Sequence, residues 1–476
     1  MSALWQLPAQ DLARHIAHKE VSCVEVIDAH LQRIHDINPQ VNAIVKVLHD
    51  EAREAARAAD KLVASGAPLG PLHGVPFTVK ENIDMAGQPT TWGVVPLAHA
   101  VAPFDAPVVE RMRAAGAIPI GRTNLPDMAL RVHTDSSLHG LTLNPWHPAR
   151  TAGGSSGGEA VALATGMSAL GLGNDIGGSL RSPASACGIA SIRPSTGRVP
   201  DAGLIPMEDR LLAVQLMNVQ GPMARTVGDV RATLRVLMGA HPRDPLAIDV
   251  PFSGPSASKP IRVAVLASPP GGPTDPAIQQ AVRRSADALA NAGYDVVEAS
   301  PPRYEEAAAC WAQLLLGDFA LALPQLLPMM GQDARTFLDR ACASVPAFPD
   351  AAALSALLVQ RDGIARAWSQ FLADTPLLLS PTWTQLPFEV GFDVATPAGT
   401  SAITELMRPL VPANLMGLPS ACVPAGMDQD SGLPIGVLLT GARFREDLCL
   451  DAAEVVERQS GLSTPMTPIT TIKPRA

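Results

Sequence analysis

From about residue 70 onward, short apolar runs alternate with helical stretches, and glycine and proline separate them. Residues 75–79 and 117–120 are such apolar runs, and a weakly polar stretch covers residues 160–172. The alternation returns near the middle of the chain, where strand-like residues 261–266 and 294–297 flank a helical segment. Strands that alternate with helices predict an α/β protein, in which helices pack against a central sheet.

Helical spacing dominates the regions outside this alternation. Ser22 has the side chain of a helix N-cap, and Glu25 three residues later completes a capping box for a helix over 22–36. Further helices are predicted over residues 8–19, 51–64, 275–292, 304–372 and 445–459, and further strands over 377–379, 421–423 and 435–439. The late strands imply that the end of the chain returns to the sheet.

A proline-rich stretch at 241–260 is the clearest candidate for a domain boundary in this chain of 476 residues. It contains five prolines together with Ser and Gly, which indicates a surface connection. This stretch fits a linker between two domains and also a surface loop within one domain, but strand-like segments continue beyond it. We therefore expect one large α/β domain with a mostly parallel or mixed, twisted central sheet and helices on both faces.

Composition and charge limit the classes of function. Apolar residues make up 47% of the chain and charged residues 17%, which favours a compact globular protein over disorder. The net charge of −9 argues against a nucleic-acid partner. The six cysteines form no CxxC pair, so we expect no metal. Because neither a signal peptide nor an apolar run of about 18 residues is visible, we expect a cytoplasmic protein without a membrane partner.

Two glycine-serine segments and one lysine carry the candidate chemistry. Residues 153–158 read Gly-Gly-Ser-Ser-Gly-Gly, residues 177–179 read Gly-Gly-Ser, and Lys80 ends an apolar run. Glycines before a serine let several backbone N–H groups converge on one point, where they can stabilise the oxyanion that forms when a serine attacks a carbonyl. A buried lysine loses its charge and can then act as a base. Each segment alone also fits an ordinary turn or a surface lysine.

In combination, these segments resemble the amidase signature family. Ser179 follows Ser155 by 24 residues, which is the usual spacing in that family. The other matching segments are Gly-Arg-Thr-Asn-Leu-Pro at 121–126, Asn-Pro-Trp at 144–146 with Arg-Thr at 150–151, Gly-Arg-Val-Pro at 197–200, Gly-Pro-Met-Ala-Arg at 221–225, Gly-Leu-Pro at 417–419 and Gly-Leu-Pro-Ile-Gly at 432–436. The match is dense over about 70–230, sparse over 240–400, and returns at 410–460.

The resemblance implies that residues 1–476 form a single domain with the amidase signature fold. N-terminal helices would occupy residues 1–69, and the signature core with the catalytic residues 70–235. A variable, helix-rich region on the substrate side would cover 241–400, and residues 401–476 would return to the core sheet.

The resemblance also implies hydrolysis of a small carboxamide to a carboxylic acid and ammonia or an amine. Ser179 is then the nucleophile, Ser155 in a cis peptide relays the proton, and uncharged Lys80 accepts it. An acyl-enzyme forms and water hydrolyses it, without any cofactor. The expected oxyanion hole consists of four backbone N–H groups, those of Ile176, Gly177, Gly178 and Ser179.

Other residues receive supporting or substrate-side roles. Ser156 and Asp175 are expected to hold the loops by hydrogen bonds, and Arg181 to anchor a buried charge. Asn174 stands where the family often has threonine, which bears on the support of the oxyanion loop. A strongly apolar segment separates the matching regions. We hypothesise that Trp311, Phe319 and Met330 of this segment line a pocket for an acyl or aryl group. Ordinary helix packing is the alternative.

Several functional alternatives stay open. The chain also resembles the glutamine-hydrolysing subunit of a tRNA-dependent amidotransferase, but Glu159 stands where that subunit has an alanine-rich sequence. Urea, carbamate or ester hydrolysis would use the same acyl-transfer machinery. A catalytically inactive binding relative is the non-enzymatic alternative, and retention of Lys80 and both serines argues against it. The expected partner is a small amide substrate, and a homodimer is left open.

Overall fold

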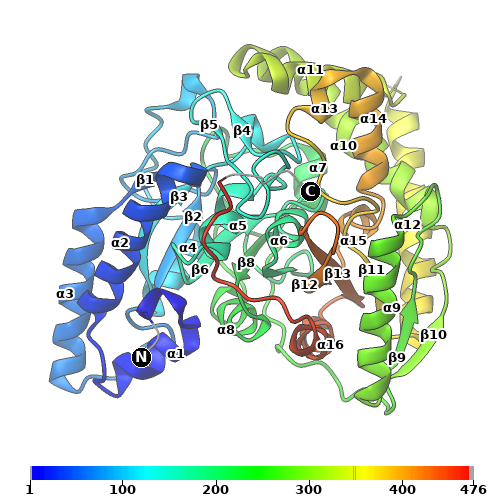
Figure 1. Cartoon of the computed structure of the whole chain (residues 1–476). Coiled ribbons are helices and arrows are strands. Elements are labelled where there is room, and N and C mark those ends of the chain that lie inside the picture. Colours follow the sequence, from blue (N-terminus) through cyan, green and yellow to red (C-terminus); the bar gives the residue numbers. More distant parts are fainter. Residues whose placement is uncertain (1–2, 347, 349, 471–476) are drawn as a thin grey trace.

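The computed structural model describes residues 3–346, 348 and 350–470. In that part of the chain, eleven strands form one sheet in the order β1-β3-β2-β6-β8-β7-β12-β13-β11-β9-β10, and β4 and β5 form a separate ribbon (Figure 1). The strands are β1 (Ile44–Val47), β2 (Pro76–Lys80), β3 (Ile118–Thr123), β4 (Asp135–Ser136), β5 (Gly140–Leu141), β6 (Leu170–Asn174), β7 (Ala190–Arg193), β8 (Gln220–Ala224), β9 (Arg262–Val265), β10 (Asp295–Glu298), β11 (Leu377–Pro381), β12 (Ser420–Met427) and β13 (Pro434–Gly441).

Helices surround the sheet. The α-helices are α1 (Ala9–Ala17), α2 (Cys23–Val41), α3 (His49–Ser65), α4 (Pro107–Ala114), α5 (Gly157–Ala164), α6 (Arg181–Cys187), α7 (Leu212–Met217), α8 (Val227–Leu237), α9 (Pro276–Asn291), α10 (Tyr304–Leu326), α11 (Gln332–Ala343), α12 (Ala351–Asp374), α13 (Phe392–Ala395), α14 (Pro397–Leu406), α15 (Val411–Met416) and α16 (Glu446–Gln459). Short 3₁₀ helices lie at Leu4–Gln6, Val95–Leu97, Asp127–Ala129 and Leu327–Met329. Figure 1 shows α2 and α3 beside one end of the sheet and α9 and α12 beside the other.

The sheet is mixed, which is one of the two forms expected from the sequence. β2 pairs in parallel with β3 and β6, and β9 pairs in parallel with β10 and β11. The remaining pairings are antiparallel. The centre is antiparallel because β12 and β13 form a hairpin and because β8 lies between β6 and β7.

Both faces of the sheet carry helices, and β13 shows this directly. A side chain at Gly436 would meet Ser185 of α6, whereas a side chain at Gly441 would meet Cys449 of α16. Positions separated by an odd number of residues point to opposite faces of a strand. α6 and α16 therefore cover opposite faces, as the sequence predicted for an α/β domain.

The local signals of the sequence correspond to observed elements. Glu25 donates its N–H to Ser22 Oγ at 3.1 Å, and the Glu25 carboxylate accepts the Ser22 N–H at 2.8 Å, so the capping box begins α2. The weakly polar stretch 160–172 is divided between α5 and β6. Strand β2 and the strand expected at 75–79 differ by one residue at each end, which brings Lys80 into the ladder.

The region 241–400 supplies strands as well as helices. It contributes β9, β10 and β11 to the sheet, so it is built into the same domain. One apolar core cluster extends from α1 to α16 across this region. Among the described residues, the segment Tyr304–Met329 has the length and apolar composition that a membrane span needs, and 50% of its most apolar window is buried inside the protein.

Candidate active site

The site lies at the carboxyl ends of two neighbouring parallel strands. Lys80 is the last residue of β2 and Asn174 is the last residue of β6. Thr78 is paired with Gly171 in this ladder, so both strands end at the same edge of the sheet. The chain then turns through residues 175–180 and enters α6. Loops that follow parallel strands at one edge are where α/β proteins place their binding sites.

Lys80 carries its amino group into a fully buried position. It is 0% exposed, and Nζ donates to Ser155 Oγ at 2.8 Å and to Asn174 Oδ1 at 2.7 Å. Burial lowers the pKa of Lys80 to about 7, although the negative charges of Asp175 and Glu159 oppose this shift. An amine with this pKa is mostly uncharged at slightly alkaline pH, so it can accept a proton.

Ser155 is held in a tightly packed loop. The peptide bond between Gly154 and Ser155 is cis, the geometry that the family resemblance implies at this position. The Gly154 carbonyl accepts a hydrogen bond from Ser182 Oγ at 2.6 Å. A side chain at position 154 would come within 2.7 Å of the Val132 backbone, so only glycine fits there. The loop sequence therefore fixes Ser155 beside Lys80.

The loop after β6 presents backbone N–H groups around Ser179. Gly178 has a φ of +106°, which bends the chain directly before Ser179. Within the described part of the chain, the N–H groups of Ile176, Gly177 and Ser179 have no hydrogen-bond partner. The Gly178 N–H, in contrast, donates to Asp175 Oδ1 at 2.7 Å. The expectation that Gly178 contributes to an oxyanion hole is therefore corrected, because its N–H already anchors the loop.

A buried ionic cluster holds this loop in place. Asp175 accepts hydrogen bonds from Arg181 Nε at 3.0 Å, from Asn414 Nδ2 at 2.7 Å and from the Leu180 N–H at 3.2 Å. Burial alone would raise the pKa of Asp175, but the charges of Arg181 and Arg193 hold that pKa well below its usual range. Asp175 and Arg181 are both 0% exposed, so the turn is fixed by a charge pair that water does not reach.

Ser156 does not have the hydrogen-bonding role expected from the sequence. Among the described residues its Oγ is buried and has no hydrogen-bond partner. A side chain at Gly173 would lie 2.9 Å from this oxygen, so Ser156 occupies the space that glycine leaves in β6. Its support for the loop is by packing, together with its backbone carbonyl, which accepts the Ala160 N–H at the start of α5.

Glu159 is a component of the site whose role the sequence analysis missed. Its carboxylate accepts the hydroxyl groups of Thr78 and Thr123, the latter at 2.8 Å, so one side chain of α5 links β2 and β3. Gly171 in β6 leaves room for it, since a side chain there would overlap the carboxylate. Burial raises the pKa of Glu159 to about 8, and the Thr78 and Thr123 hydrogen bonds oppose this. The available signal was its position directly after the Gly-Gly-Ser-Ser-Gly-Gly segment, in the first turn of α5.

Two adjoining cavities open at Ser179. One, of about 140 Å³, is lined by Ser155, Ser179 and Phe319 among others, and the second, of about 70 Å³, is lined by Ser179, Phe319 and Trp311. Trp311 Nε1 also donates to the Ile176 carbonyl at 3.0 Å, which orients the Ile176–Gly177 peptide group that carries the N–H of Gly177. Trp311 and Phe319 therefore lie at cavities beside Ser179, and their contact with an acyl or aryl group stays a prediction.

Met330 was placed in the same hypothesis, and the structure corrects it. Met330 is 3% exposed and lines neither cavity. It follows the 3₁₀ turn after α10, where its N–H donates to Leu327 and its carbonyl accepts from Arg335. The side chain belongs to the apolar core, and Leu326, the last residue of α10, is the final residue of this segment that lines the larger cavity.

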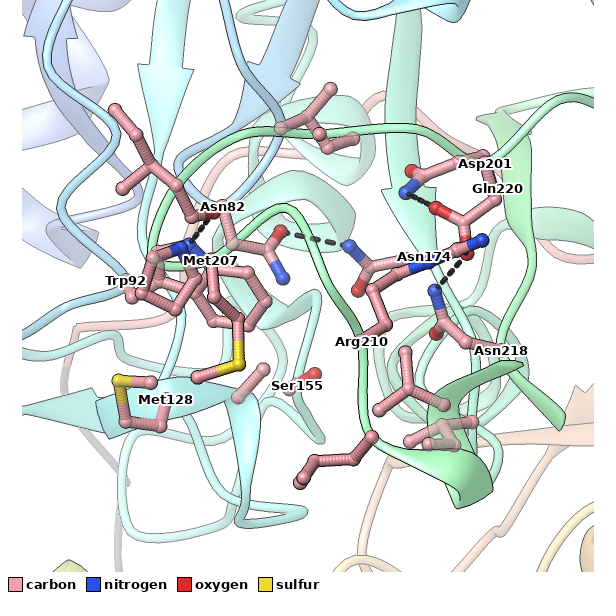
Figure 2. Close-up of a pocket in the computed structure, with 18 of the residues that line it drawn as sticks. Asn82, Trp92, Met128, Ser155, Asn174, Asp201, Met207, Arg210, Asn218 and Gln220 are labelled. Atoms are coloured by element: carbon pink, nitrogen blue, oxygen red, sulfur yellow. Dashed lines mark hydrogen bonds and ion pairs between the residues drawn. The ribbon is translucent and has the colours of Figure 1, made fainter. Parts of the chain in front are cut away.

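The larger cavity has an apolar side and a polar side (Figure 2). Trp92, Met128 and Met207 lie on one side of it, and Asp201 and Gln220 lie on the other. These residues carry no spacing pattern in the sequence, because they come from loops, a 3₁₀ helix and a strand that are far apart in the chain.

Asn82 and Asn174 connect this cavity to Lys80. Asn174 Nδ2 donates to Asn82 Oδ1 at 2.9 Å, while Asn174 Oδ1 accepts from Lys80. Asn82 lines the larger cavity (Figure 2). The signal for Asn174 was present as a departure from the family pattern, and its contact with Lys80 shows what the departure changes. In the described part of the chain, no group of three His, Cys, Asp or Glu side chains could hold a metal ion.

Comparisons with known proteins agree with this geometry. The family model named Amidase matches residues 25–450. An indoleacetamide hydrolase of Bradyrhizobium diazoefficiens is 40% identical over 461 residues, which cover 96% of this chain and 87% of that protein. A glutamyl-tRNA(Gln) amidotransferase subunit from Thermosynechococcus vestitus is 32% identical over 481 residues, with 94% and 97% covered.

A solved structure shows the same likeness in three dimensions. The 6-aminohexanoate cyclic dimer hydrolase, in complex with its substrate, superimposes with a TM-score of 0.83 at 29% identity, and the match covers 97% of this chain and 98% of that one. The family match spans nearly all of the chain, and the relatives and the solved structure agree with it. The chain therefore belongs to the amidase signature family and is an enzyme that hydrolyses amide carbon–nitrogen bonds.

Proposed function

We propose that this amide hydrolase cleaves small carboxamides with an aromatic acyl group, using Ser179 as nucleophile, Ser155 as proton relay and Lys80 as base. The observation that carries the proposal is the 2.8 Å contact between Lys80 Nζ and Ser155 Oγ at a cavity that Ser179 also lines. A buried amine with a lowered pKa beside one serine, and a second serine at the same cavity, supply the three groups that acyl transfer needs.

In the proposed reaction, uncharged Lys80 accepts the proton of Ser155 while Ser155 accepts the proton of Ser179. The Ser179 oxygen forms a bond to the amide carbon, and the carbonyl electrons move onto the carbonyl oxygen. When this intermediate collapses, the C–N bond breaks and the proton returns through Ser155 to the leaving nitrogen. Water then attacks the acyl ester by the same proton route, which releases the acid and restores Ser179.

The negative oxygen of the intermediate needs hydrogen-bond donors that are already in place. We assign this role to the free N–H groups of Ile176, Gly177 and Ser179. Each donor of this kind typically stabilises the transition state by about 3–4 kcal/mol. The Asp175–Arg181 pair holds the turn that presents them, so no reorganisation is required when the charge develops.

The cavity walls support an aromatic acyl group. Trp92, Met128, Phe319 and Leu326 surround the larger cavity with flat or flexible apolar side chains. The relative that is 40% identical is named an indoleacetamide hydrolase, and indoleacetamide joins an aromatic ring to a primary amide through one methylene group. Arylacetamides of this kind are the substrates to test first.

Glutamine hydrolysis for a tRNA-dependent enzyme is less well supported, although a subunit of that kind is 32% identical. Glutamine carries an ammonium and a carboxylate, which need charged partners in a binding site. Among the described residues that line this cavity, the cation is Arg210, and it is paired with Asp201 at 2.6 Å, so no free cation is left for the carboxylate of glutamine.

An ammonia-release panel tests the proposal. Arylacetamides, aliphatic amides, glutamine, an anilide, a carbamate and an ester are compared by kcat/KM with the purified full chain. We expect arylacetamides to give the highest values. A preference for glutamine, or activity only with partner subunits added, would contradict the proposed substrate class.

The proposal also includes a cytoplasmic enzyme that needs no metal, organic cofactor or nucleic acid. Dialysis against a chelator should leave kcat unchanged, and loss of activity that a metal restores would contradict this part. Light scattering of the purified protein tests whether a homodimer forms.

A further inference from the structure

Asp201 organises the polar side of the larger cavity. Its carboxylate accepts hydrogen bonds from Arg210 Nη1 at 2.6 Å, from Asn218 Nδ2 at 2.8 Å and from Gln220 Nε2 at 2.8 Å (Figure 2). All four residues line the cavity. The charge of Asp201 is balanced by Arg210, so this side of the cavity is polar but neutral overall.

The carboxylate also fixes the orientation of the Gln220 side chain. Because Nε2 donates to Asp201 Oδ1, the amide oxygen of Gln220 must point elsewhere. The reversed amide would place two oxygens 2.8 Å apart, which electrostatic repulsion forbids. In the described part of the chain, Gln220 Oε1 is buried and has no hydrogen-bond partner, and the residue as a whole is only 9% exposed.

Gln220 is also close to the catalytic edge of the sheet. It begins β8 and is paired with Asn174 of β6, whose side chain holds Lys80. A buried acceptor without a donor costs free energy, and such a group needs an explanation where it occurs. Here the acceptor belongs to a residue in the wall of the cavity that Ser155 and Ser179 line.

The lining contains one other buried side-chain oxygen without a partner among the described residues, Oδ1 of Asp84. Asp84 differs from Gln220 because it is a carboxylate whose charge acts on the nearby Arg122, and its other oxygen accepts the Leu204 N–H at 2.6 Å. Its carboxylate is therefore part of a charged group, whereas Gln220 presents a neutral amide oxygen. A neutral acceptor on a neutral wall matches an uncharged N–H or O–H donor.

We infer that Gln220 determines specificity by accepting a hydrogen bond from the aromatic ring of the acyl group, so that the preferred arylacetamide carries a ring N–H or O–H. This inference rests on the proposed function, since it requires the acyl group to occupy the larger cavity. Trp92 and Met128 on the apolar side would contact the faces of the ring, and Gln220 would accept a hydrogen bond from the donor at the ring edge.

Two substrates of the same shape test this inference. Indole-3-acetamide has a ring N–H, and benzofuran-3-acetamide has an oxygen in its place. For the parent enzyme we expect kcat/KM to be about 10- to 100-fold higher for the indole compound, because the analogue without the donor leaves the acceptor unpaired. In Gln220→Met, which keeps the side-chain length and removes the acceptor, this ratio should fall to near one.

Gln215→Met is the matched control. Gln215 is exposed on α7 and donates to the Arg210 carbonyl, so it undergoes the same chemical change outside this cavity. It should keep the parent ratio. Binding of both amides to Ser179→Ala and to Ser179→Ala/Gln220→Met, measured by calorimetry, gives the same comparison without turnover and shows that each variant folds.

The outcomes separate the inference from the proposed function. Equal kcat/KM for the two substrates in the parent enzyme would overturn the inference alone. A ratio that persists in Gln220→Met would also overturn it, because another acceptor such as Asp84 would then be reading the donor. If the parent hydrolyses neither arylacetamide but cleaves other amides, the proposed substrate class fails and the inference fails with it.

Discussion

The edge of the sheet that carries the proposed chemistry and the wall of the cavity that receives the acyl group differ in how they are assembled. The catalytic edge consists of Lys80, Ser155 and Ser179, which lie on β2, before α5 and before α6, and almost all of its polar contacts are internal. The cavity wall draws on loops, strands and helices from Asn82 to Leu326 and contains a buried acceptor that has no partner among the described residues.

Rigidity and selectivity therefore lie in different parts of the site. At the catalytic edge, closely packed glycines and the buried Asp175–Arg181 pair hold each catalytic group in one position. Transition-state stabilisation requires groups that are fixed in this way. In the wall, an acceptor without a partner among the described residues and apolar side chains are available to a ligand. Substitutions at the edge should affect all substrates alike, whereas substitutions in the wall should change their ranking.

The largest effect is expected for Ser179→Ala. Loss of the nucleophile should reduce kcat by roughly 10⁵-fold or more for every amide, since the remaining groups have no hydroxyl to activate. A fluorophosphonate probe should label the parent at Ser179 and leave this variant unlabelled. Labelling of the parent at another serine would break the assignment of the catalytic edge.

Lys80→Ala should rank next, with a loss in kcat of about 10²- to 10⁴-fold, the usual contribution of a general base. The pH profile is the sharper readout. Because only uncharged Lys80 accepts a proton and its pKa is lowered to about 7, kcat/KM of the parent should fall as pH drops below about 7. This acidic limb should disappear in Lys80→Ala. A parent profile that stays flat from about pH 8 to about pH 5 would rule out this base.

Phe319→Ala and Met330→Ala form a matched pair for the wall. Phe319 lines both cavities, so its truncation should lower kcat/KM for arylacetamides by about 10- to 100-fold and for acetamide much less. Met330 is equally buried but lines neither cavity. Its truncation should lower the free energy of unfolding by about 2–5 kcal/mol and leave the ranking of substrates unchanged. Equal effects of both variants on all substrates would remove the distinction between wall and core.

The smallest effect is expected for Glu159→Gln, which keeps the shape of the side chain and removes its charge. Because the pKa of Glu159 is raised to about 8, its carboxyl carries little negative charge at about pH 7, and its remaining charge raises the pKa of Lys80. Glu159→Gln should therefore move the acidic limb of kcat/KM only slightly, toward lower pH. The change in kcat at about pH 8 should stay below about tenfold, because Glu159 acts through Lys80 rather than on the substrate. Glu159→Asp serves as the control that keeps the charge. A limb that moves to higher pH in Glu159→Gln would contradict this coupling.

The predictions from sequence succeeded where a local pattern determines structure. The alternation after residue 70 predicted the α/β domain, and the Ser22–Glu25 capping box predicted the start of α2. They were wrong for details that depend on neighbours. Ser156 was given a hydrogen bond that its packing against Gly173 removes, and Gly178 was given a free N–H that Asp175 occupies.

The cavity wall shows the same limit more strongly. Trp311 and Phe319 were selected because they are apolar, and so was Met330, although α10 brings only the first two to the cavities. Nothing in the sequence separates these three, because an apolar side chain has the same periodicity in a core and in a pocket wall. Gln220 and Asp201 lie 19 residues apart and gain their meaning only from their contact.

The order of residues along the chain was enough to indicate the chemistry. The informative features were the glycines beside the two serines, the 24-residue interval between those serines, and the lysine that ends an apolar strand. These signals are local, so a linear pattern can contain them. Only the folded structure shows which polar groups lack a hydrogen-bond partner, because a hydrogen bond depends on atoms that the fold brings together. That is why the candidate catalytic residues could be named from the chain, while the acceptor proposed to select the substrate, Gln220 Oε1, became visible only in the fold.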